Sequence, residues 1–388
     1  MTDSAAQPNN PTSLELAIIT LAAGKGSRMK SDLPKVLHAL AGKPMLRHVL
    51  DSAAQLDRAH QQAHQHVVIG HGAEQVQNEM SDLNITWALQ TEQKGTGHAV
   101  AQAMPNVSSD ALVLVLYGDV PLISPETLQS LLTETHASAE SCGGLALLTM
   151  KLDNPTGYGR IVRDDSGNIL AIVEQKDASP EQLAINEVNT GILAASAQHF
   201  QRWLPQLSAE NAQGEYYLTD VVALAVAEGT AVRAIHPADN IEVQGVNDKV
   251  QLSLLERVYQ RQLADQLLRD GTSLADPDRI DIRGTLRVGR DVEIDIGCIF
   301  EGEVDLEDGV RIGPYCTISN SRIGAGSSIE AYSMLDQANV DSQCQVGPYA
   351  RLRPGADIAD GARVGNFVEI KKSRLGPGAK ANHLTYLG

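Results

Sequence analysis

Small or aliphatic residues recur at every sixth position after residue 285, and this periodicity limits the fold more than any other feature of the chain. One series is Leu286, Val292, Cys298, Val304, Val310 and Cys316, and a second series runs two residues behind it. The spacing shortens to five between Ile318 and Ile323, slips again before Val340, and continues to Ile370. No helix repeats every six residues, whereas three hexapeptides form one triangular coil, and stacked coils bury a continuous aliphatic core. The pattern predicts a left-handed parallel β-helix.

The region before this repeat has the alternation of an α/β domain. Aliphatic runs that are apolar on both faces occupy 16–22, 66–70, 111–117 and 144–149, and amphipathic stretches at 44–56 and 125–132 separate them. Such runs are typical of a parallel sheet that is covered by helices on both faces. Two further strand candidates, 159–162 and 169–174, flank a turn and are expected to cap the sheet. We therefore predict a Rossmann-like, doubly wound α/β domain.

Changes of pattern give the expected domain boundaries. Residues 1–14 are polar and are predicted to be a disordered lead, and the α/β domain is expected over 15–245. Helical spacing from Leu252 to Leu267, ending near Gly271, predicts a linker helix within 246–272. The β-helix then occupies 273–388. Because a solenoid needs a polar cap or further coils, and the sequence stops at Gly388 without one, we expect a chain shortened at its C-terminus.

Charge and cysteine usage exclude several classes of function. The formal net charge of the 388 residues is −17 at pH 7, which argues against nucleic-acid or anionic-membrane partners, since both attract basic surfaces. No apolar run is long enough to span a membrane. The four cysteines are Cys142, Cys298, Cys316 and Cys344; none forms a CxxC pair, so we expect a reducing, cytoplasmic compartment. Three hexapeptides, or one full coil, separate Cys298 from Cys316, so these two are predicted to stack as core residues.

A glycine-rich loop follows the first predicted strand. The segment from Leu21 to Met29 reads LAAGKGSRM, and Lys35 ends the LPK that comes next. Glycine lets the main chain approach a phosphate or a base, and Arg28 and Lys35 can neutralise a triphosphate. The loop is neither a P-loop nor a GxGxxG motif. The alternative is a simple turn with two solvated cations, but the order strand, GxG, Arg, Pro-Lys favours a phosphate site.

A carboxylate stands at the end of another central strand. Asp119 follows the apolar run that ends at Leu116-Tyr117-Gly118. Ligands of doubly wound sheets bind outside the carboxyl ends of the strands. Mg²⁺ prefers few protein ligands together with water and substrate phosphate. Asp119 is therefore a candidate Mg²⁺ ligand.

Five segments together carry a resemblance to known enzymes. They are LAAGKGSRM with LPK, GTGHA at 95–99, YGDVPL at 117–122, PTGYGR at 155–160 and EVNTGI at 187–192. The first resembles the N-terminal motif of sugar nucleotidyltransferases. With the hexapeptide region, the chain is similar from about Leu16 to Gly388 to bifunctional N-acetylglucosamine-1-phosphate uridyltransferases that also carry a glucosamine-1-phosphate acetyltransferase domain. The resemblance implies Mg²⁺-dependent transfer of UMP from UTP to N-acetylglucosamine 1-phosphate, acetyl-CoA as co-substrate of the second domain, and a homotrimer.

The resemblance also assigns roles within the first domain. Arg28 and Lys35 would be catalytic, and Asp119 and Asn247 would hold the metal. The remaining contacts to nucleotide and sugar would come from Leu21, Ala22, Gly24, Gln90, Gly95, Thr96, Tyr117, Gly159, Glu174 and Asn189, with Gln90, Gly95 and Thr96 at the uracil and the last three at the sugar phosphate. Taken alone, Asn247 reads equally as a helix N-cap, Glu174 as a surface carboxylate and Asn189 as a turn residue. His98 is expected to pack at a helix start rather than to act as a base.

A second candidate site lies at the end of the β-helix. Polar residues interrupt the aliphatic repeat at 351–355, 365–372 and 382–386. By resemblance His383 is the base of acetyl transfer, and Arg353, Lys371 and Tyr386 hold glucosamine 1-phosphate. We further expect Glu369 to orient His383. The alternative is a solvated rim, and because the sequence stops shortly after His383, acetyltransferase activity is expected to be nearly absent.

Two other functions remain open at this point. A related nucleotidyltransferase that makes ADP-glucose or dTDP-glucose shares the GxGxR and Pro-Lys pattern. A catalytically silent scaffold, trimerised by its β-helix, is the alternative from another class. The intact set Arg28, Lys35, Asp119 and Asn247 argues against the scaffold, because a silent copy has no physical need for all four.

Overall fold

The computed structural model describes residues 15–58, 63–136 and 143–388, so the predicted lead 1–14 and Cys142 lie outside the described residues. The chain divides into two compact units. One consists of Met1–His38 and Pro44–Gln251 and is called the α/β unit below; the other consists of Ala39–Lys43 and Leu252–Gly388 and is called the β-helix unit. Across the described ranges, no helix is both long and apolar enough to cross a membrane.

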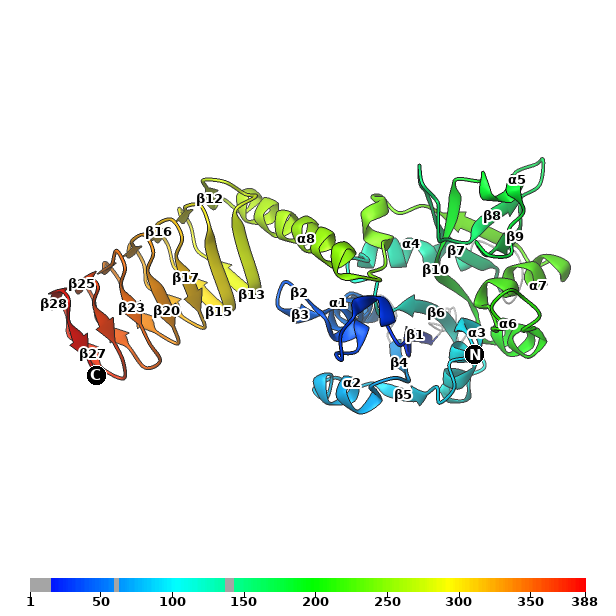
Figure 1. The fold of residues 1–388 in the computed structure, drawn as a ribbon, viewed down its shortest axis with the longest axis horizontal. Coiled ribbons are helices and arrows are strands. Elements are labelled where there is room, and N and C mark those ends of the chain that lie inside the picture. Colours follow the sequence, from blue (N-terminus) through cyan, green and yellow to red (C-terminus); the bar gives the residue numbers. More distant parts are fainter. Residues whose placement is uncertain (1–14, 59–62, 137–142) are drawn as a thin grey trace, which may run out of the picture. The chain divides into compact units, whose positions relative to one another are not determined.

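A mixed sheet forms the centre of the α/β unit (Figure 1). Its strand order is β11 (Val232–Ile235), β7 (Leu145–Lys151), β10 (Glu187–Ser196), β6 (Leu112–Tyr117), β1 (Leu16–Ala22), β4 (Ala63–Ile69) and β5 (Thr86–Leu89). Pairing is parallel except around β10, which runs antiparallel to both β6 and β7. The four sheet strands predicted from sequence, β1, β4, β6 and β7, run parallel to one another, whereas the antiparallel β10 between β6 and β7 was not predicted. The two cap strands are confirmed as β8 (Arg160–Arg163) and β9 (Ile169–Val173), and β8 joins the sheet at β10.

Helices cover both faces of this sheet, as the two-sided apolar strands predicted. They are α1 (Met45–Ala54), α2 (Ala73–Glu79), α3 (Thr96–Ala103), α4 (Pro125–His136), α6 (Ala197–Trp203) and α7 (Val221–Ala227). The short helix α5 (Pro180–Leu183) buries none of its residues and lies against the cap strand β8. Neighbouring residues of β1 point to opposite faces: Ile18 packs with residues of α1 and α4, whereas Ile19 packs with residues of α3, α6 and α7. The carboxyl ends of β1 and β6 are left open between these layers.

The predicted linker helix is α8 (Lys249–Arg269). Asp248 caps it, because its Oδ1 accepts hydrogen bonds from the main-chain nitrogens of Val250 and Gln251, each at 2.9 Å. The N-cap role considered for Asn247 is therefore wrong, and its side chain is available to the site described below. In the β-helix unit, Glu256 of α8 accepts a hydrogen bond of 2.7 Å from the main-chain nitrogen of Ala41, between the short strands β2 (Ala39–Leu40) and β3 (Lys43–Pro44).

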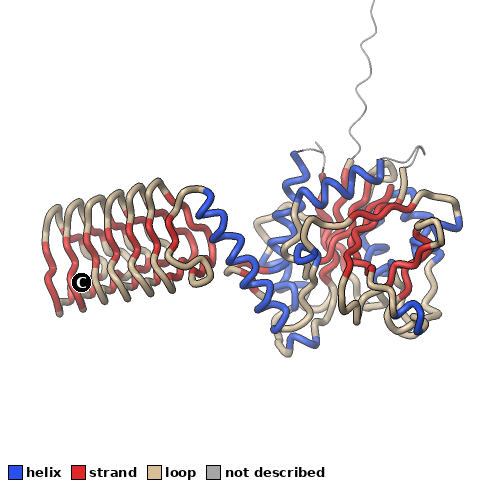
Figure 2. The backbone as a smooth tube through the Cα atoms, turned by 90° about the horizontal axis from the view of Figure 1, so that it is seen from above, coloured by secondary structure: helices blue, strands red, loops and turns tan. Residues whose placement is uncertain are grey.

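The repeat region forms a left-handed parallel β-helix with three strand faces (Figure 2). The first face contains β12 (Ser273–Leu274), β14 (Glu293–Ile294), β16 (Arg311–Ile312), β19 (Ser328–Ile329), β22 (Gln345–Val346), β25 (Arg363–Asn366) and β28 (Lys380–His383). The second contains β17 (Thr317–Ser319), β20 (Met334–Asp336), β23 (Arg351–Leu352), β26 (Glu369–Ile370) and β29 (Tyr386–Leu387). The third contains β18 (Arg322–Ile323), β21 (Asn339–Val340), β24 (Asp357–Ile358) and β27 (Arg374–Leu375). The longer strands β13 (Ile280–Val288) and β15 (Cys298–Leu306) join the last two faces.

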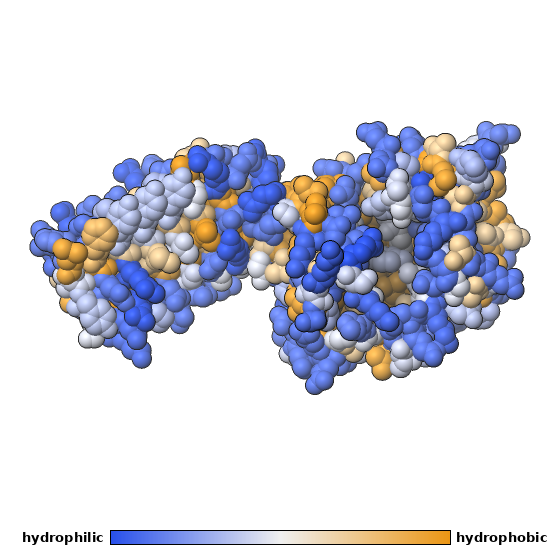
Figure 3. Space-filling view, in the orientation of Figure 1, coloured by the Kyte–Doolittle hydropathy of each residue, from blue (hydrophilic) through white to orange (hydrophobic). Residues whose placement is uncertain are grey.

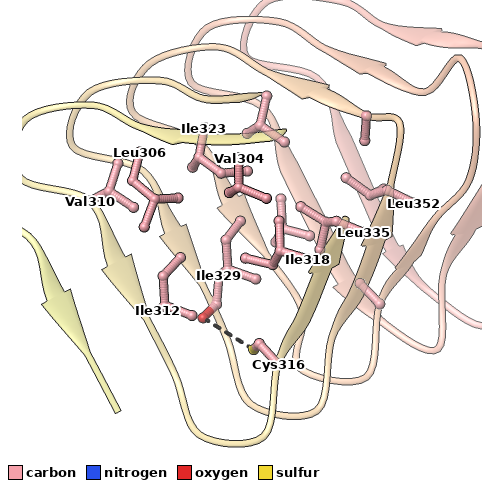
Figure 4. Packing of buried hydrophobic residues seen from close by; sticks show 14 of the residues in the cluster. Val304, Leu306, Val310, Ile312, Cys316, Ile318, Ile323, Ile329, Leu335 and Leu352 are labelled. Carbon is pink, nitrogen blue, oxygen red and sulfur yellow. Dashed lines mark hydrogen bonds between the residues drawn. The ribbon is translucent and has the colours of Figure 1, made fainter. Parts of the chain in front are cut away.

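The register of the coils explains the slips in the sequence repeat. Ile299 pairs with Thr317, which follows it by three full hexapeptides. Thr317 pairs in turn with Met334, a step that is one residue shorter. Each shortened hexapeptide therefore shortens a coil without moving the aliphatic positions out of the core (Figure 4). Cys298 and Cys316 lie buried in successive coils, as predicted.

Candidate functional site

A cavity of about 380 Å³ opens at the carboxyl ends of β1 and β6 in the α/β unit. Nine of the residues assigned to the nucleotide by sequence line it: Leu21, Ala22, Gly24, Lys35, Gln90, Gly95, Thr96, Tyr117 and Asp119. These residues come from four separate segments of the chain, which meet because parallel strands end at the same edge of the sheet. The face of the unit that is seen in Figure 3 is largely hydrophilic.

Four charged or polar side chains converge at one edge of this cavity. The Lys35 ammonium donates to Asp119 Oδ2 and lies 3.5 Å from Asn247 Oδ1. Arg28 donates to the same Asn247 oxygen at 2.7 Å. The two cations and the two oxygen ligands predicted from sequence therefore form one continuous cluster, although Arg28 and Asn247 lie far apart in the chain.

Local geometry explains how the loop delivers Lys35. Gly26 adopts a left-handed conformation with φ of 59° and ends the glycine loop, before the 3₁₀ turns Ser27–Met29 and Lys35–Leu37. A Cβ at Gly26 would lie 2.6 Å from the Cβ of Lys35. The close approach of the lysine leaves no room for a Cβ at this position, and glycine adopts the left-handed angle without strain.

The main chain also fixes Asn247. The nitrogen of Val246 donates to the main-chain oxygen of Asp119 at 2.8 Å, and the nitrogen of Asn247 donates to Gln251 Oε1 at 2.7 Å. Since Asp248 already caps α8, the Asn247 amide oxygen points to the cluster rather than to the helix.

The donor set suits a magnesium ion. Among the residues the structure describes, no three His, Cys, Asp or Glu side chains gather as a metal site. Asp119 and Asn247 instead bring one carboxylate and one amide oxygen to a single cation, the Lys35 ammonium. Mg²⁺ is commonly bound by one or two protein oxygens with water and substrate phosphates, so the pair fits this ion.

A second group of predicted residues lies together beside Tyr117. The main-chain oxygen of Gly159 accepts from the nitrogen of Asn189 at 2.9 Å, and a Cβ at Gly159 would lie 3.3 Å from Glu174 Oε1. Burial raises the pKa of Glu174, and the carboxylates of Asp220 and Asp177 raise it further. Asn189 also makes the turn-type contact considered for it, since its Oδ1 accepts from the nitrogen of Gly191 at 3.1 Å.

Tyr117 connects the two groups. Burial raises the pKa of its hydroxyl well above the usual range, and the carboxylates of Glu174 and Asp119 act in the same direction. A Cβ at Gly191 would lie 2.5 Å from its ring, so glycine there admits the ring. Tyr117 therefore stays neutral and can donate a hydrogen bond.

The segment 215–219 borders the site and was missed by the sequence analysis. Thr219 donates to Glu174 Oε1 at 3.2 Å, and the main-chain oxygen of Tyr216 accepts from the nitrogen of Gly97 at 2.8 Å. Thr96 Oγ1 accepts from the nitrogen of Leu218 at 3.0 Å. The paired aromatics Tyr216 and Tyr217 after a glycine were the available signal, in a chain with only 4% aromatic residues.

The predicted acetyltransferase residues lie on the last described coils of the β-helix unit. Arg353 donates to Glu369 Oε1 at 2.8 Å, and Glu369 pairs in register with Tyr386. His383 is exposed and pairs in register with Asn366 on the first face. The carboxylate of Glu369 is thus engaged by Arg353, and the expectation that it orients His383 is not supported by this geometry.

Comparisons with known proteins agree with this arrangement. A family model described as the MobA-like NTP transferase domain matches residues 18–150, the segment that contains Arg28, Lys35 and Asp119. A curated protein of Marinobacter nauticus named bifunctional protein GlmU is 54% identical over 373 residues, which are 96% of this chain and 80% of that protein. The chain belongs to the GlmU family.

GlmU membership confirms the expected order of a nucleotidyltransferase domain and a parallel β-helix. A crystal structure from Bacillus anthracis, described as a glucose-1-phosphate thymidylyltransferase in complex with a sucrose, is 19% identical with a TM-score of 0.48 and covers 63% of this chain and 94% of that one. The contacts of individual residues with substrates stay predictions.

Proposed function

We propose that the α/β unit transfers UMP from UTP to N-acetylglucosamine 1-phosphate, which makes this GlmU-family chain a UDP-N-acetylglucosamine diphosphorylase. The observation that carries the proposal is the convergence of Arg28, Lys35, Asp119 and Asn247 beside the cavity at the ends of β1 and β6. Two cations next to a divalent-ion ligand pair are what the α-phosphate of a nucleoside triphosphate and a pyrophosphate leaving group require.

The chemistry needs no general base. A phosphate oxygen of N-acetylglucosamine 1-phosphate attacks the α-phosphorus of UTP, a bond forms between them, and the bond to the pyrophosphate oxygen breaks in line. The attacking oxygen is already anionic, so no proton is removed. Catalysis then consists of positioning and charge neutralisation. Lys35 and Arg28 neutralise charge on the α-phosphate and on the departing pyrophosphate.

Asp119 and Asn247 would hold Mg²⁺. The ion supplies additional neutralisation of the triphosphate when it is bound. A bound cation would compete with the Lys35 ammonium for the Asp119 and Asn247 oxygens. We therefore expect the ammonium to turn toward the α-phosphate. Arg28, which donates to the same Asn247 oxygen, would orient this amide before substrate binds and then exchange the contact for phosphate.

The other residues around the cavity set the choice of substrate. Gln90, Gly95 and Thr96 would contact the uracil, and Leu21, Ala22 and Gly24 would lie along the nucleotide. Glu174, Asn189 and Gly159 would hold the sugar phosphate, with neutral Tyr117 between the two substrates. The positions of these residues support the division. The residues assigned to the uracil and the nucleotide line the cavity, whereas Glu174, assigned to the sugar phosphate, does not line it but is close enough to raise the pKa of Tyr117.

For the β-helix unit we infer a relation to acetyl transfer. The amine of glucosamine 1-phosphate would attack the thioester carbon of acetyl-CoA, His383 would take the amine proton, and CoA would leave as the thiol. Arg353, Lys371 and Tyr386 would hold the sugar phosphate, and Arg353 would exchange its contact with Glu369 for the phosphate. The product is the acceptor of the first reaction. A cytoplasmic homotrimer is part of this proposal.

A pyrophosphate-release assay tests the main proposal. We expect turnover with UTP, Mg²⁺ and N-acetylglucosamine 1-phosphate, and little with ATP or dTTP and glucose 1-phosphate. Asp119→Asn should lower kcat by about 10²-fold or more, because the metal loses its charged ligand. Preference for ATP or dTTP would favour the related nucleotidyltransferases, and no turnover with any pair would favour the scaffold. A parallel assay of thiol release from acetyl-CoA tests the acetyl-transfer role inferred for the β-helix unit.

A further inference from the structure

The side-chain amide of Gln90 is held in one orientation. Gln90 is 3% exposed, and its Nε2 lies 3.1 Å from the main-chain oxygen of Gly95 and 3.0 Å from Nδ1 of His98. A main-chain carbonyl only accepts hydrogen bonds, so the group facing Gly95 must be the amide nitrogen. Both of its hydrogens are thereby used, one toward Gly95 and one toward His98.

The oxygen of the same amide is left for the ligand. No hydrogen bond among the described residues uses Gln90 Oε1, and Gln90 lines the cavity beside Gly95 and Thr96. The main chain of Gln90 is fixed as well, since its nitrogen donates to the oxygen of Ile69 at 2.8 Å. The site therefore presents an acceptor, and not a donor, to a base bound there.

This arrangement requires a particular form of His98. Because Gln90 donates to Nδ1, Nδ1 must carry a lone pair, and the neutral ring carries its proton on Nε2. Gln102, one turn later on α3, has its side-chain nitrogen 3.2 Å from the main-chain oxygen of His98 and 3.3 Å from Nε2, so this nitrogen is held by the carbonyl and does not set the tautomer of the ring. His98 itself does not line the cavity, so it acts on the ligand only through Gln90.

We propose that His98 is a positioning residue that sets nucleobase selectivity by holding Gln90 with its oxygen toward the base. Uracil offers an N3–H to that oxygen, whereas cytosine has a lone pair at N3 and would meet the acceptor unfavourably. A site built to receive an N–H rejects an analogue that lacks it. Without the Nδ1 acceptor, only the Gly95 carbonyl opposes reversal of the Gln90 amide, so the orientation that offers its nitrogen to cytosine becomes more accessible. This inference rests on the proposed uridylyl transfer.

The selectivity test compares UTP with CTP in the pyrophosphate assay. His98→Ala should lower the ratio of kcat/KM for UTP to that for CTP by about tenfold or more, mainly through the KM for UTP, because one buried hydrogen-bond partner is lost. His98→Asn should keep most of the ratio, since its Oδ1 can take the place of Nδ1. Gln102→Ala is the matched control on the other side of the ring and should leave the ratio unchanged.

Several results would overturn the role of His98. An unchanged ratio in His98→Ala, or an equal loss in His98→Asn, contradicts it. If His98→Ala does not fold, His98→Gln replaces it. The Gln side chain reaches toward the former position of Nε2 and not of Nδ1, so we expect the preference for UTP to be lost. A preference for UTP as high as that of His98→Asn would contradict the proposal. A ¹H–¹⁵N long-range NMR spectrum of the wild-type chain should show Nδ1 of His98 unprotonated, and a protonated Nδ1 would refute the geometry. Wild-type protein that does not turn over UTP would instead refute the proposed function.

Discussion

Lys35 links the proposed metal ligands to the proposed phosphate site. Its ammonium contacts Asp119 and lies within reach of Asn247, so it is positioned between the metal ligands and the space for the α-phosphate. We predict that Lys35→Ala lowers kcat by about 10²- to 10³-fold, whereas the KM for UTP changes far less, because the charge acts mainly in the transition state. Steady-state kinetics measure both constants, and Lys151→Ala, an exposed lysine at the end of β7, is the control. A raised KM with unchanged kcat would show that Lys35 only binds UTP.

Glu174 couples activity to stability. Since burial raises its pKa in the folded chain, ionisation of Glu174 above its unfolded pKa of about 4.3 weakens folding, and the penalty grows until the pH passes the folded pKa. Glu174→Gln should therefore stabilise the α/β unit more at pH 8 than at pH 4, while kcat/KM for the sugar phosphate falls. Denaturant melts at the two pH values measure this, with exposed Glu210→Gln as control. A variant that is equally stable at both pH values would contradict the assigned cause.

For single residues, the sequence predicted which side chains belong to the site better than it predicted their hydrogen-bond partners. Arg28, Lys35 and Asp119 follow motifs that name their chemistry, and the structure brings them together. Asn247 was placed only by resemblance, because Asn and Asp next to a helix start look alike in sequence, and Asp248 is the residue that caps α8. The contact of Glu369 with Arg353 was not predicted, because side-chain pairing across coils depends on three-dimensional register, which the local sequence does not show.

Among the elements of the β-helix unit, one corner carries a ladder of aromatic rings. Tyr315, Tyr332, Tyr349 and Phe367 stack with centroid separations of 5.2, 5.1 and 5.3 Å, and a row of rings crosses the unit in Figure 3. Each has a left-handed φ between 56° and 59°, which costs a non-glycine residue about 1–2 kcal/mol. Stacking between exposed rings offsets part of this cost.

The ladder gives a prediction for the stability of the coils. Tyr332→Ala removes a ring with a partner on each side and keeps the left-handed backbone, so it should destabilise the β-helix unit by about 1–3 kcal/mol. Tyr332→Phe keeps both stacking contacts and should change stability by less than about 0.5 kcal/mol. Chemical denaturation followed by circular dichroism measures both. Equal losses in the two variants would mean that the hydroxyl, and not the stacking, matters.

Element types were predictable where one periodicity holds over many residues. The six-residue repeat predicted the coils, and even its slips, because each core position must point inward whatever the coil length. The ladder was not predicted. Its rings repeat once per coil, every 17 or 18 residues, and the six-residue repeat does not show a period of this length. The antiparallel β10 was also missed: strand direction is set by pairing with β6 and β7, and an apolar strand reads the same in either direction.

For the whole molecule, the division into two units separates the proposed uridylyl-transfer site from the solenoid. All residues of the proposed uridylyl-transfer site belong to the α/β unit, and its core clusters share no residue with the core of the β-helix unit. Solenoid coils contact only their neighbours, so damage in a late coil can remain local. Nucleotidyl transfer should therefore tolerate the loss of late coils.

Ile358→Asp tests this separation. Ile358 is fully buried in the β-helix core, and a carboxylate there should cost at least about 3 kcal/mol and open the adjacent coils. We predict increased proteolysis after residue 340 and a lost or lowered melting transition, while kcat for pyrophosphate release stays within about twofold of wild type, the range expected when no catalytic contact changes. Arg363→Ala, exposed on the next strand β25, should change neither property. If turnover fell in step with the fraction of folded β-helix, the uridylyl-transfer site would need contacts from the solenoid, and the assignment of that site to the α/β unit alone would be wrong.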